Sequence, residues 1–275
     1  MVHSQTQQIV FTGSVLSGYF LSGVVYILLP IAAYLLMMHR KAARFYPVVT
    51  GVIVYFIAER FSALFASLFG ASQGFMSKTV IAAEIICYLE ETGRYFAMKY
   101  PVTNIKNTNA AVCYGIGHAG LECFIRAYQK FQIYSYGQRL NSKGLDSFIS
   151  GKSAEKADSI TRQLQTYADH SLFLSIVDSL GSIVTFGVQI ALSLLIFKKI
   201  HYEKRWLLLA ILLHLFVNFA VWLASLTDDP LFTDFIGIIA GGAVIAIVFR
   251  IIGLHNCMNE IKNTSGNKKD KPIYN

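Results

Sequence analysis

The sequence predicts an all-α membrane protein, a bundle of about seven transmembrane helices that encloses a buried polar cavity. Of its 275 residues, 54% are hydrophobic and only 15% are charged. The mean hydropathy is +0.48. Apolar residues gather in stretches of about 20, the length that a helix needs to cross a bilayer. Several stretches also contain ionisable side chains, which must face protein or water because lipid cannot solvate them.

The predicted spans are joined by short connections, with one exception. They cover residues 15–38, 47–69, 79–98, 109–131, 171–197, 206–226 and 234–254. The exception is an outer loop, 132–170, in which Ser153 resembles the N-cap of a short amphipathic helix. Ile160, Leu164 and Tyr167 share one face of that helix. We expect it either to lie at the outer interface or to cover an intramembrane cavity as a lid.

The spans are expected to form one transmembrane domain, residues 1–258. A basic tail, 259–275, is polar and is predicted to be disordered. In the last span, Gly237 and Gly241 have the small-xxx-small spacing of closely packed membrane helices. The cysteines have no C-x-x-C spacing, and we expect buried thiols rather than disulfides. They are Cys87, Cys113, Cys123 and Cys257.

The basic residues predict the orientation in the cell membrane. Lys and Arg gather after the first, third, fifth and seventh spans, whereas the short outer turns hold only Lys78. Cytoplasmic segments carry such an excess, so the N-terminus is predicted outside and the C-terminus inside. The net charge of +8 thus lies at the ends of apolar stretches, where lipid head groups account for it. The bilayer is the expected partner, and nucleic acid is not.

Four spans place polar side chains at one depth. Glu90, His118, Gln189 and His214 each lie eight or nine residues from the predicted inner end of their span. That is ~12–14 Å at ~1.5 Å per residue, close to the midplane. Polar groups so deep must face one another or a wet cavity. The layer therefore predicts a buried polar site.

Three of these residues have a polar partner one turn away on the same helix face. The pairs are Glu90 with Arg94, His118 with Glu122, and His214 with Asn218. Glu91 lies ~100° around the helix from Glu90, so a rotation of the helix would exchange the two glutamates.

The chemistry that fits these residue types is water activation. A carboxylate beside an imidazole, such as Glu90 with His118, can take a proton from water. A second imidazole and an amide, His214 and Asn218, can donate hydrogen bonds to the oxyanion formed at an attacked peptide carbonyl.

No cofactor is expected, but a zinc ion is an alternative. The candidate ligands are His118, Glu122 and His214. The H-E-x-x-H spacing of zincin-type sites is absent.

Other functions fit the same residues. Glu90 and Arg94 can be read as an ion pair that makes a charged helix tolerable in the bundle, and a histidine in a span can be a packing residue. A protein that keeps such a cavity without efficient chemistry would bind a peptide, a lipid or a partner helix, as in immunity to a bacteriocin. A proton-coupled transporter is a further alternative, because chains of Glu and His also relay protons.

The motifs together resemble those of a known family. E-E-x-x-R at 90–94, G-x-G-H-x-x-x-E at 115–122 and H-x-x-x-N at 214–218 are similar to the motifs of YhfC-type intramembrane proteases. These look like relatives of the CAAX-protease and bacteriocin-processing group, which includes the Ras-converting endopeptidase. The resemblance covers about residues 15–254. It implies a glutamic-type endopeptidase that cuts a membrane-embedded, prenylated or leader peptide.

The resemblance also implies roles for individual residues. Glu90 would be the general base and His118 its partner. His214 and Asn218 would be the oxyanion donors. The remaining motif residues, which would orient or neutralise the site, are Glu91, Arg94 and Glu122.

The sequence departs from the family pattern in the fifth span. Gly181 and Ser182 stand where a Glu-Arg pair is expected, and Gln189 stands in place of a histidine. Glutamine hydrogen-bonds but cannot take up a proton or readily bind zinc. The glutamine argues against a metal site and against full catalytic activity. The binding or immunity alternative therefore stays open.

Overall fold

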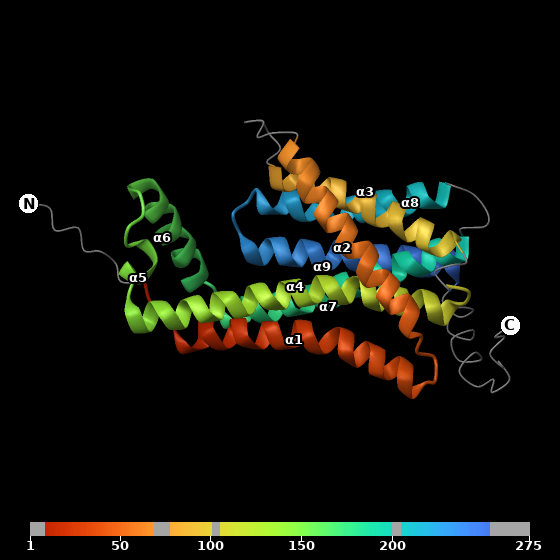
Figure 1. Ribbon diagram of the computed structural model, residues 1–275, viewed down its shortest axis with the longest axis horizontal. Coiled ribbons are helices and arrows are strands. Elements are labelled where there is room, and N and C mark those ends of the chain that lie inside the picture. Colours follow the sequence, from red (N-terminus) through yellow and green to blue (C-terminus); the bar gives the residue numbers. More distant parts are fainter. Residues whose placement is uncertain (1–8, 69–77, 101–104, 200–204, 254–275) are drawn as a thin grey trace, which may run out of the picture. The chain divides into compact units, whose positions relative to one another are not determined.

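The computed structural model describes residues 9–68, 78–100, 105–199 and 205–253, and these segments are helical without strands (Figure 1). The all-α prediction is confirmed. The helices are α1 (Gly13–His39), α2 (Phe45–Leu68), α3 (Lys78–Lys99), α4 (Thr108–Lys143), α5 (Asp146–Ile149), α6 (Ala154–Ala168), α7 (Leu172–Lys199), α8 (Arg205–Ser225) and α9 (Pro230–Ile252).

Five helices in the described segments are long and apolar enough to cross a membrane. They are α1, α7, α8, α9 and the Phe45–Phe65 part of α2. The membrane class is thus confirmed. The third and fourth predicted spans correspond to α3 and α4, which are less apolar than the five helices named above. The count of seven spans and the orientation of the termini stay predictions, and the tail 259–275 lies outside the described residues.

Helix α4 is longer than the sequence analysis predicts. The expected end was residue 131, but the helix continues to Lys143 and has 36 residues. At ~1.5 Å per residue it is ~54 Å long, more than the ~30 Å of a hydrocarbon core. The added residues are polar but include no proline, so nothing stops the helix before Gly144. That glycine has a φ of 71° and donates its N–H to the Leu140 carbonyl at 2.9 Å, which ends the helix.

The chain divides into two compact units. One comprises residues 1–27 and 124–179, and the other comprises residues 28–123 and 180–275. All predicted site residues belong to the second unit. The single domain of residues 1–258 stays a prediction.

In the first unit, the predicted amphipathic helix is confirmed as α6. The Ser153 side chain accepts the backbone N–H of Lys156 and caps the helix. Leu164 is buried, and Ile160 and Tyr167 pack against the same cluster. The buried members of this cluster, drawn from α1, the segment just before it, α4 and α6, are Phe11, Val15, Tyr19, Leu140 and Leu164.

In the second unit, α3 packs between α2 and α8, and α9 packs against α8 (Figure 1). The glycines predicted to allow close packing in α9 do so. A Cβ at Gly241 would lie 2.6 Å from Val184 Cγ1 of α7, and one at Gly237 would lie 3.2 Å from Val221 Cγ2 of α8. Close approach at these two positions therefore needs the missing side chain.

Two further glycines bring α2 and α4 into backbone contact. A Cβ at Gly51 would clash with the carbonyl oxygen of Tyr114 and the backbone nitrogen of His118. A Cβ at Gly117 would clash with the Val48 carbonyl. Because these contacts are with backbone atoms, they cannot be relieved by a change of rotamer. The crossing of α2 and α4 fixes the position of His118.

A Gly51→Ala variant is expected to be less stable by about 1–3 kcal/mol, the usual effect of overpacking. This outweighs the better helix propensity of alanine, which amounts to about 1 kcal/mol. Gly242→Ala is the matched control, because a Cβ there meets nothing within 4 Å. Thermal unfolding of both variants in detergent micelles checks the prediction. Equal melting temperatures for the two variants would contradict it.

Candidate active site

One face of α3 carries four buried side chains within two turns. Cys87, Glu91 and Arg94 are fully buried, and Glu90 is 3% exposed. Buried charges cost several kcal/mol each unless they are paired and hydrogen-bonded. The partners of these groups come from α4, α7 and α8, so this face of α3 is the centre of the site.

Glu90 contacts two of the predicted residues through one oxygen. Its Oε2 lies 3.1 Å from Nε2 of His118 on α4 and accepts the amide N–H of Gln189 on α7 at 3.3 Å. The longer approach of His214 Nδ1 to Glu90, 3.9 Å, is to the same oxygen, Oε2. The predicted pairing of Glu90 with His118 is thus observed.

Glu91 is also in the site. Its Oε1 lies 2.8 Å from Nδ1 of His214 on α8 and 3.2 Å from the Arg94 guanidinium. The sequence paired Arg94 with Glu90, but the structure pairs it with Glu91, three residues away, because Glu90 is turned towards α4. Glu91 Oε2 is buried and has no hydrogen-bond partner among the described residues. The nearest histidine thus differs between the two glutamates: it is His118 for Glu90 and His214 for Glu91. Both glutamates face the site.

Gln189 links the guanidinium to Glu90. Its Oε1 accepts a hydrogen bond from Arg94, and its Nε2 donates to Glu90. An amide has an acceptor at one end and donors at the other, which this position requires. Arg94 thereby orients both glutamates, one directly and one through Gln189.

His118 is held by two tyrosines. Its ring meets the edge of Tyr55 on α2, with centroids 5.2 Å apart, and stacks on Tyr114 at 5.9 Å. Its Nδ1 is buried and has no hydrogen-bond partner in the described part of the chain. The sequence analysis missed both tyrosines, although Tyr114 lies one turn before His118 and could have been found by that spacing.

The predicted pair on α8, His214 and Asn218, is found in the site together with Cys87, which the sequence analysis did not assign to the site. His214 contacts Glu91, and Asn218 donates its Nδ2–H to Cys87 Sγ at 2.9 Å. Glu122 is half-buried one turn beyond His118. It is not part of the group that could hold an ion.

Three buried residues of the site could together hold a metal ion. Ligand atoms of Glu90, Glu91 and His214 all lie within 4.8 Å of one another. Three such ligands with an open fourth position are usual for catalytic zinc, and Glu91 Oε2 is a buried oxygen without a partner. The residues therefore fit the ion. Of the ligands that the sequence suggested, only His214 belongs to this group.

Fold and site together define a multi-pass membrane protein with an ionisable, enclosed site among its helices. The model of the YhfC intramembrane metalloprotease family matches residues 25–233. This is most of the chain, and the chain belongs to that family, which makes it an intramembrane protease. No curated protein and no solved structure matches it.

Proposed function

We propose that the protein is a glutamic-type endopeptidase that cleaves a membrane-embedded or lipid-modified peptide. The observation that carries this proposal is the buried contact between Glu90 Oε2 and His118 Nε2, which is 3.1 Å long; Oε1 of the same carboxylate is the proposed base. A carboxylate placed beside an imidazole in a dry site can take a proton from water.

In the proposed reaction, Glu90 Oε1 takes a proton from a water molecule while the water oxygen forms a bond to the peptide carbonyl carbon. The electron pair of the carbonyl moves to its oxygen. When the intermediate collapses, the carbon–nitrogen bond breaks, and the proton held by Glu90 passes to the leaving amine. His118 fixes the carboxylate and stabilises its charge through Nε2.

His214 and Asn218 are the proposed oxyanion donors. Nδ1 of His214 lies 2.8 Å from Glu91 Oε1. In the proposed state Glu91 is ionised and accepts the proton of Nδ1, so Nε2 carries a proton only when the ring is an imidazolium. Glu90, Glu91 and Arg94 together carry one negative charge when ionised. A proton on His214 balances that charge and supplies the donor that the oxyanion needs.

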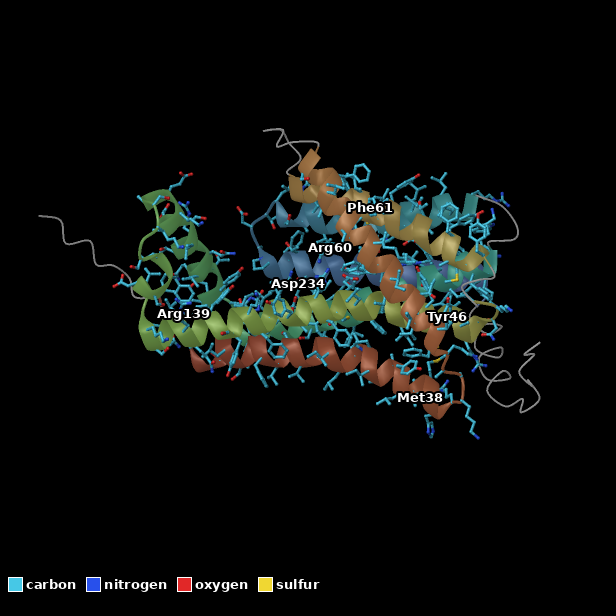
Figure 2. All side chains as sticks on the ribbon, in the orientation of Figure 1. Met38, Tyr46, Arg60, Phe61, Arg139 and Asp234 are labelled. Atoms are coloured by element: carbon cyan, nitrogen blue, oxygen red, sulfur yellow. The ribbon has the colours of Figure 1, made fainter. Side chains whose placement is uncertain are left out.

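An apolar groove beside the site supports an apolar substrate. It lies between α2 and α3 and has a volume of about 370 Å³. Gly93, next to Arg94, is part of its lining, and Phe61, labelled on α2 in Figure 2, forms part of its wall. A Cβ at Gly93 would lie 2.7 Å from Val54 Cγ1, so the glycine allows α3 to approach α2 closely at the lining of the groove. The groove suits the hydrocarbon part of a membrane peptide or of a lipid attached to it.

A metal-dependent protease is the second candidate. It is favoured by the ligand distances of Glu90, Glu91 and His214 and by the description of the family. A bound zinc ion would lower the pKa of a water molecule and polarise the peptide carbonyl. Arg94 opposes this alternative, since its positive charge lies 3.2 Å from Glu91 Oε1.

Metal analysis separates the two candidates. The protein purified without chelator is expected to hold well under one zinc per chain, and its activity is expected to survive 1,10-phenanthroline. A stoichiometric zinc that disappears in both Glu91→Gln and His214→Ala would contradict the glutamic mechanism, above all if the chelator abolished cleavage.

The proposal is tested by comparing cells that express the wild type with cells that express Glu90→Gln. The N-termini of membrane proteins and secreted peptides are determined by mass spectrometry in both. At least one new N-terminus is expected with the wild type only, and its sequence identifies the substrate. Identical sets of N-termini, with both proteins stable in the membrane, would instead favour a protein that binds a peptide without cutting it.

A further inference from the structure

Tyr114 is a large buried side chain that carries a polar group into the site beside His118. Among the described residues, only Arg94 is a larger side chain that is fully buried. The Tyr114 ring stacks on His118, with the centroids 5.9 Å apart and the planes 27° from parallel. Its backbone is fixed at the crossing of α2 and α4, where a Cβ on Gly51 would clash with the Tyr114 carbonyl. The ring therefore has a well-defined position.

The hydroxyl of Tyr114 is buried and has no hydrogen-bond partner within the segments that the structure describes. The charges that act on it are those of Arg94, Glu91 and Glu90, named from the strongest to the weakest. All three belong to the charged face of α3. Glu91 Oε2 is buried without a partner as well, so these two groups do not satisfy each other. The hydroxyl thus lies beside the reacting groups with its hydrogen-bonding capacity unused by them.

An unbonded buried hydroxyl is unfavourable, and nearly all buried polar groups in proteins have a partner. A molecule bound in the site can supply the acceptor. A phenol keeps its proton at neutral pH and donates one hydrogen bond, and the positive charge of Arg94 polarises its O–H bond. During peptide cleavage the carbonyl oxygen gains a negative charge, and tyrosine is among the side chains that stabilise such an oxyanion.

We propose that Tyr114 is a further catalytic residue, whose hydroxyl donates a hydrogen bond to the oxyanion that forms at the attacked peptide carbonyl. The inference rests on the proposed function, because it takes a peptide as the substrate. It adds a donor from α4 to those proposed on α8, so two helices hold the oxyanion. The hydroxyl keeps its proton throughout, and the electron pair of the carbonyl bond moves to the oxygen that Tyr114 contacts.

The kinetic test uses Tyr114→Phe, which removes the hydroxyl but keeps the ring that stacks on His118. On a peptide found by the N-terminal comparison, kcat is expected to fall about 10²–10³-fold, the usual effect of losing one oxyanion donor. KM is expected to change little, since the lost bond belongs to the transition state. Because the ring is retained, a wild-type kcat would overturn the inference.

Thermal unfolding in detergent micelles gives a second readout, for which no substrate is needed. Tyr114→Phe is expected to melt at the wild-type temperature or up to about 2–4 °C above it, because it removes a buried hydroxyl that has no partner. A lower melting temperature would indicate that the hydroxyl makes a structural hydrogen bond, and this result would overturn the inference.

Tyr19→Phe is the matched control. Tyr19 is also buried, but it belongs to the first unit, and its hydroxyl donates to the Tyr167 carbonyl at 3.2 Å. This variant is expected to melt below the wild type and to keep the wild-type kcat, the opposite of Tyr114→Phe in both quantities. An equal loss of kcat in the two variants would overturn the inference, since any buried hydroxyl would then have the same effect.

A tetrahedral analogue separates the transition state from the ground state. A phosphinate analogue of the cleaved peptide has oxygens that mimic the oxyanion, and it is expected to bind Tyr114→Phe about 10²-fold more weakly than the wild type. The product peptide is expected to bind both proteins equally. An equal loss of affinity for both ligands would overturn the inference, because Tyr114 would then bind the peptide without discriminating its transition state.

Glu90→Gln distinguishes this inference from the proposed function. If Glu90→Gln abolishes cleavage while Tyr114→Phe retains the wild-type kcat, the role of Tyr114 is overturned and the proposed function stands. If the wild type itself produces no new N-terminus in cells, the proposed function is overturned and the inference with it.

Discussion

The Glu90→Gln variant is expected to lose about 10²–10⁴-fold in kcat, the range that a positioned general base contributes. Glutamine has the shape of glutamate and can still accept the N–H of His118, but it cannot take a proton from water. Because the substitution also removes a buried charge, the fold is expected to be at least as stable as the wild type. KM is expected to change little, since the lost interaction belongs to the transition state.

The measurement is single-turnover cleavage of a peptide identified from cells, with thermal unfolding recorded for each variant. Glu59→Gln is the control, because Glu59 pairs with Arg60, a largely exposed residue of α2 that is labelled in Figure 2. If Glu90→Gln retained its rate while Glu91→Gln lost it, the base would be Glu91, which faces the same site.

The depth of the polar residues was enough to predict which helices form the site. Glu90, His118, Gln189 and His214 come from four helices, and the structure places them in one connected group of contacts. The reasoning succeeded because a span has a fixed length and a fixed rise per residue. Lipid cannot hydrogen-bond to charged groups in such helices, so these groups face one another inside the bundle.

The partners within the site could not be predicted in the same way. Glu90 and Glu91 differ by ~100° about the helix axis, and the rotation of α3 is set by its packing between α2 and α8. The pairing of Arg94 with Glu91 follows from that rotation. Cys87 was expected to be a buried thiol, and it is buried, but no periodicity reveals that Asn218 would meet it.

The length of α4 was missed for a different reason. Hydropathy detects only the apolar part of a helix. It does not detect a polar continuation of the same helix beyond the bilayer. The segment after residue 131 includes Gly137, which reads as a loop residue but lies against Phe11 and Leu16 of the first unit. Tertiary packing there overrides the weak helix propensity of glycine.

Arg94→Met is expected to destabilise the protein by about 3–5 kcal/mol, the cost of leaving a buried charge without its partner. Arg94 and Glu91 are both fully buried and 3.2 Å apart. Without the guanidinium, the Glu91 carboxylate has only His214 to compensate it, and Gln189 loses a donor. Arg60→Met is the control: the Arg60–Glu59 pair is 63% and 30% exposed, and such surface pairs contribute about 0–1 kcal/mol.

A second substitution distinguishes stability from function. In Glu91→Met with Arg94→Met both charges are gone, and stability is expected to return close to the wild-type value, because apolar replacement of a buried ion pair is often neutral or stabilising. Proteolysis is expected to be absent, since His214 then loses the Glu91 carboxylate that lies 2.8 Å from its Nδ1. Denaturant unfolding in micelles and the cleavage assay measure the two quantities separately. A double variant as unstable as Arg94→Met would show that these two side chains are needed for the packing of α3. A stable but inactive double variant would show that the charges in α3 are needed for the chemistry.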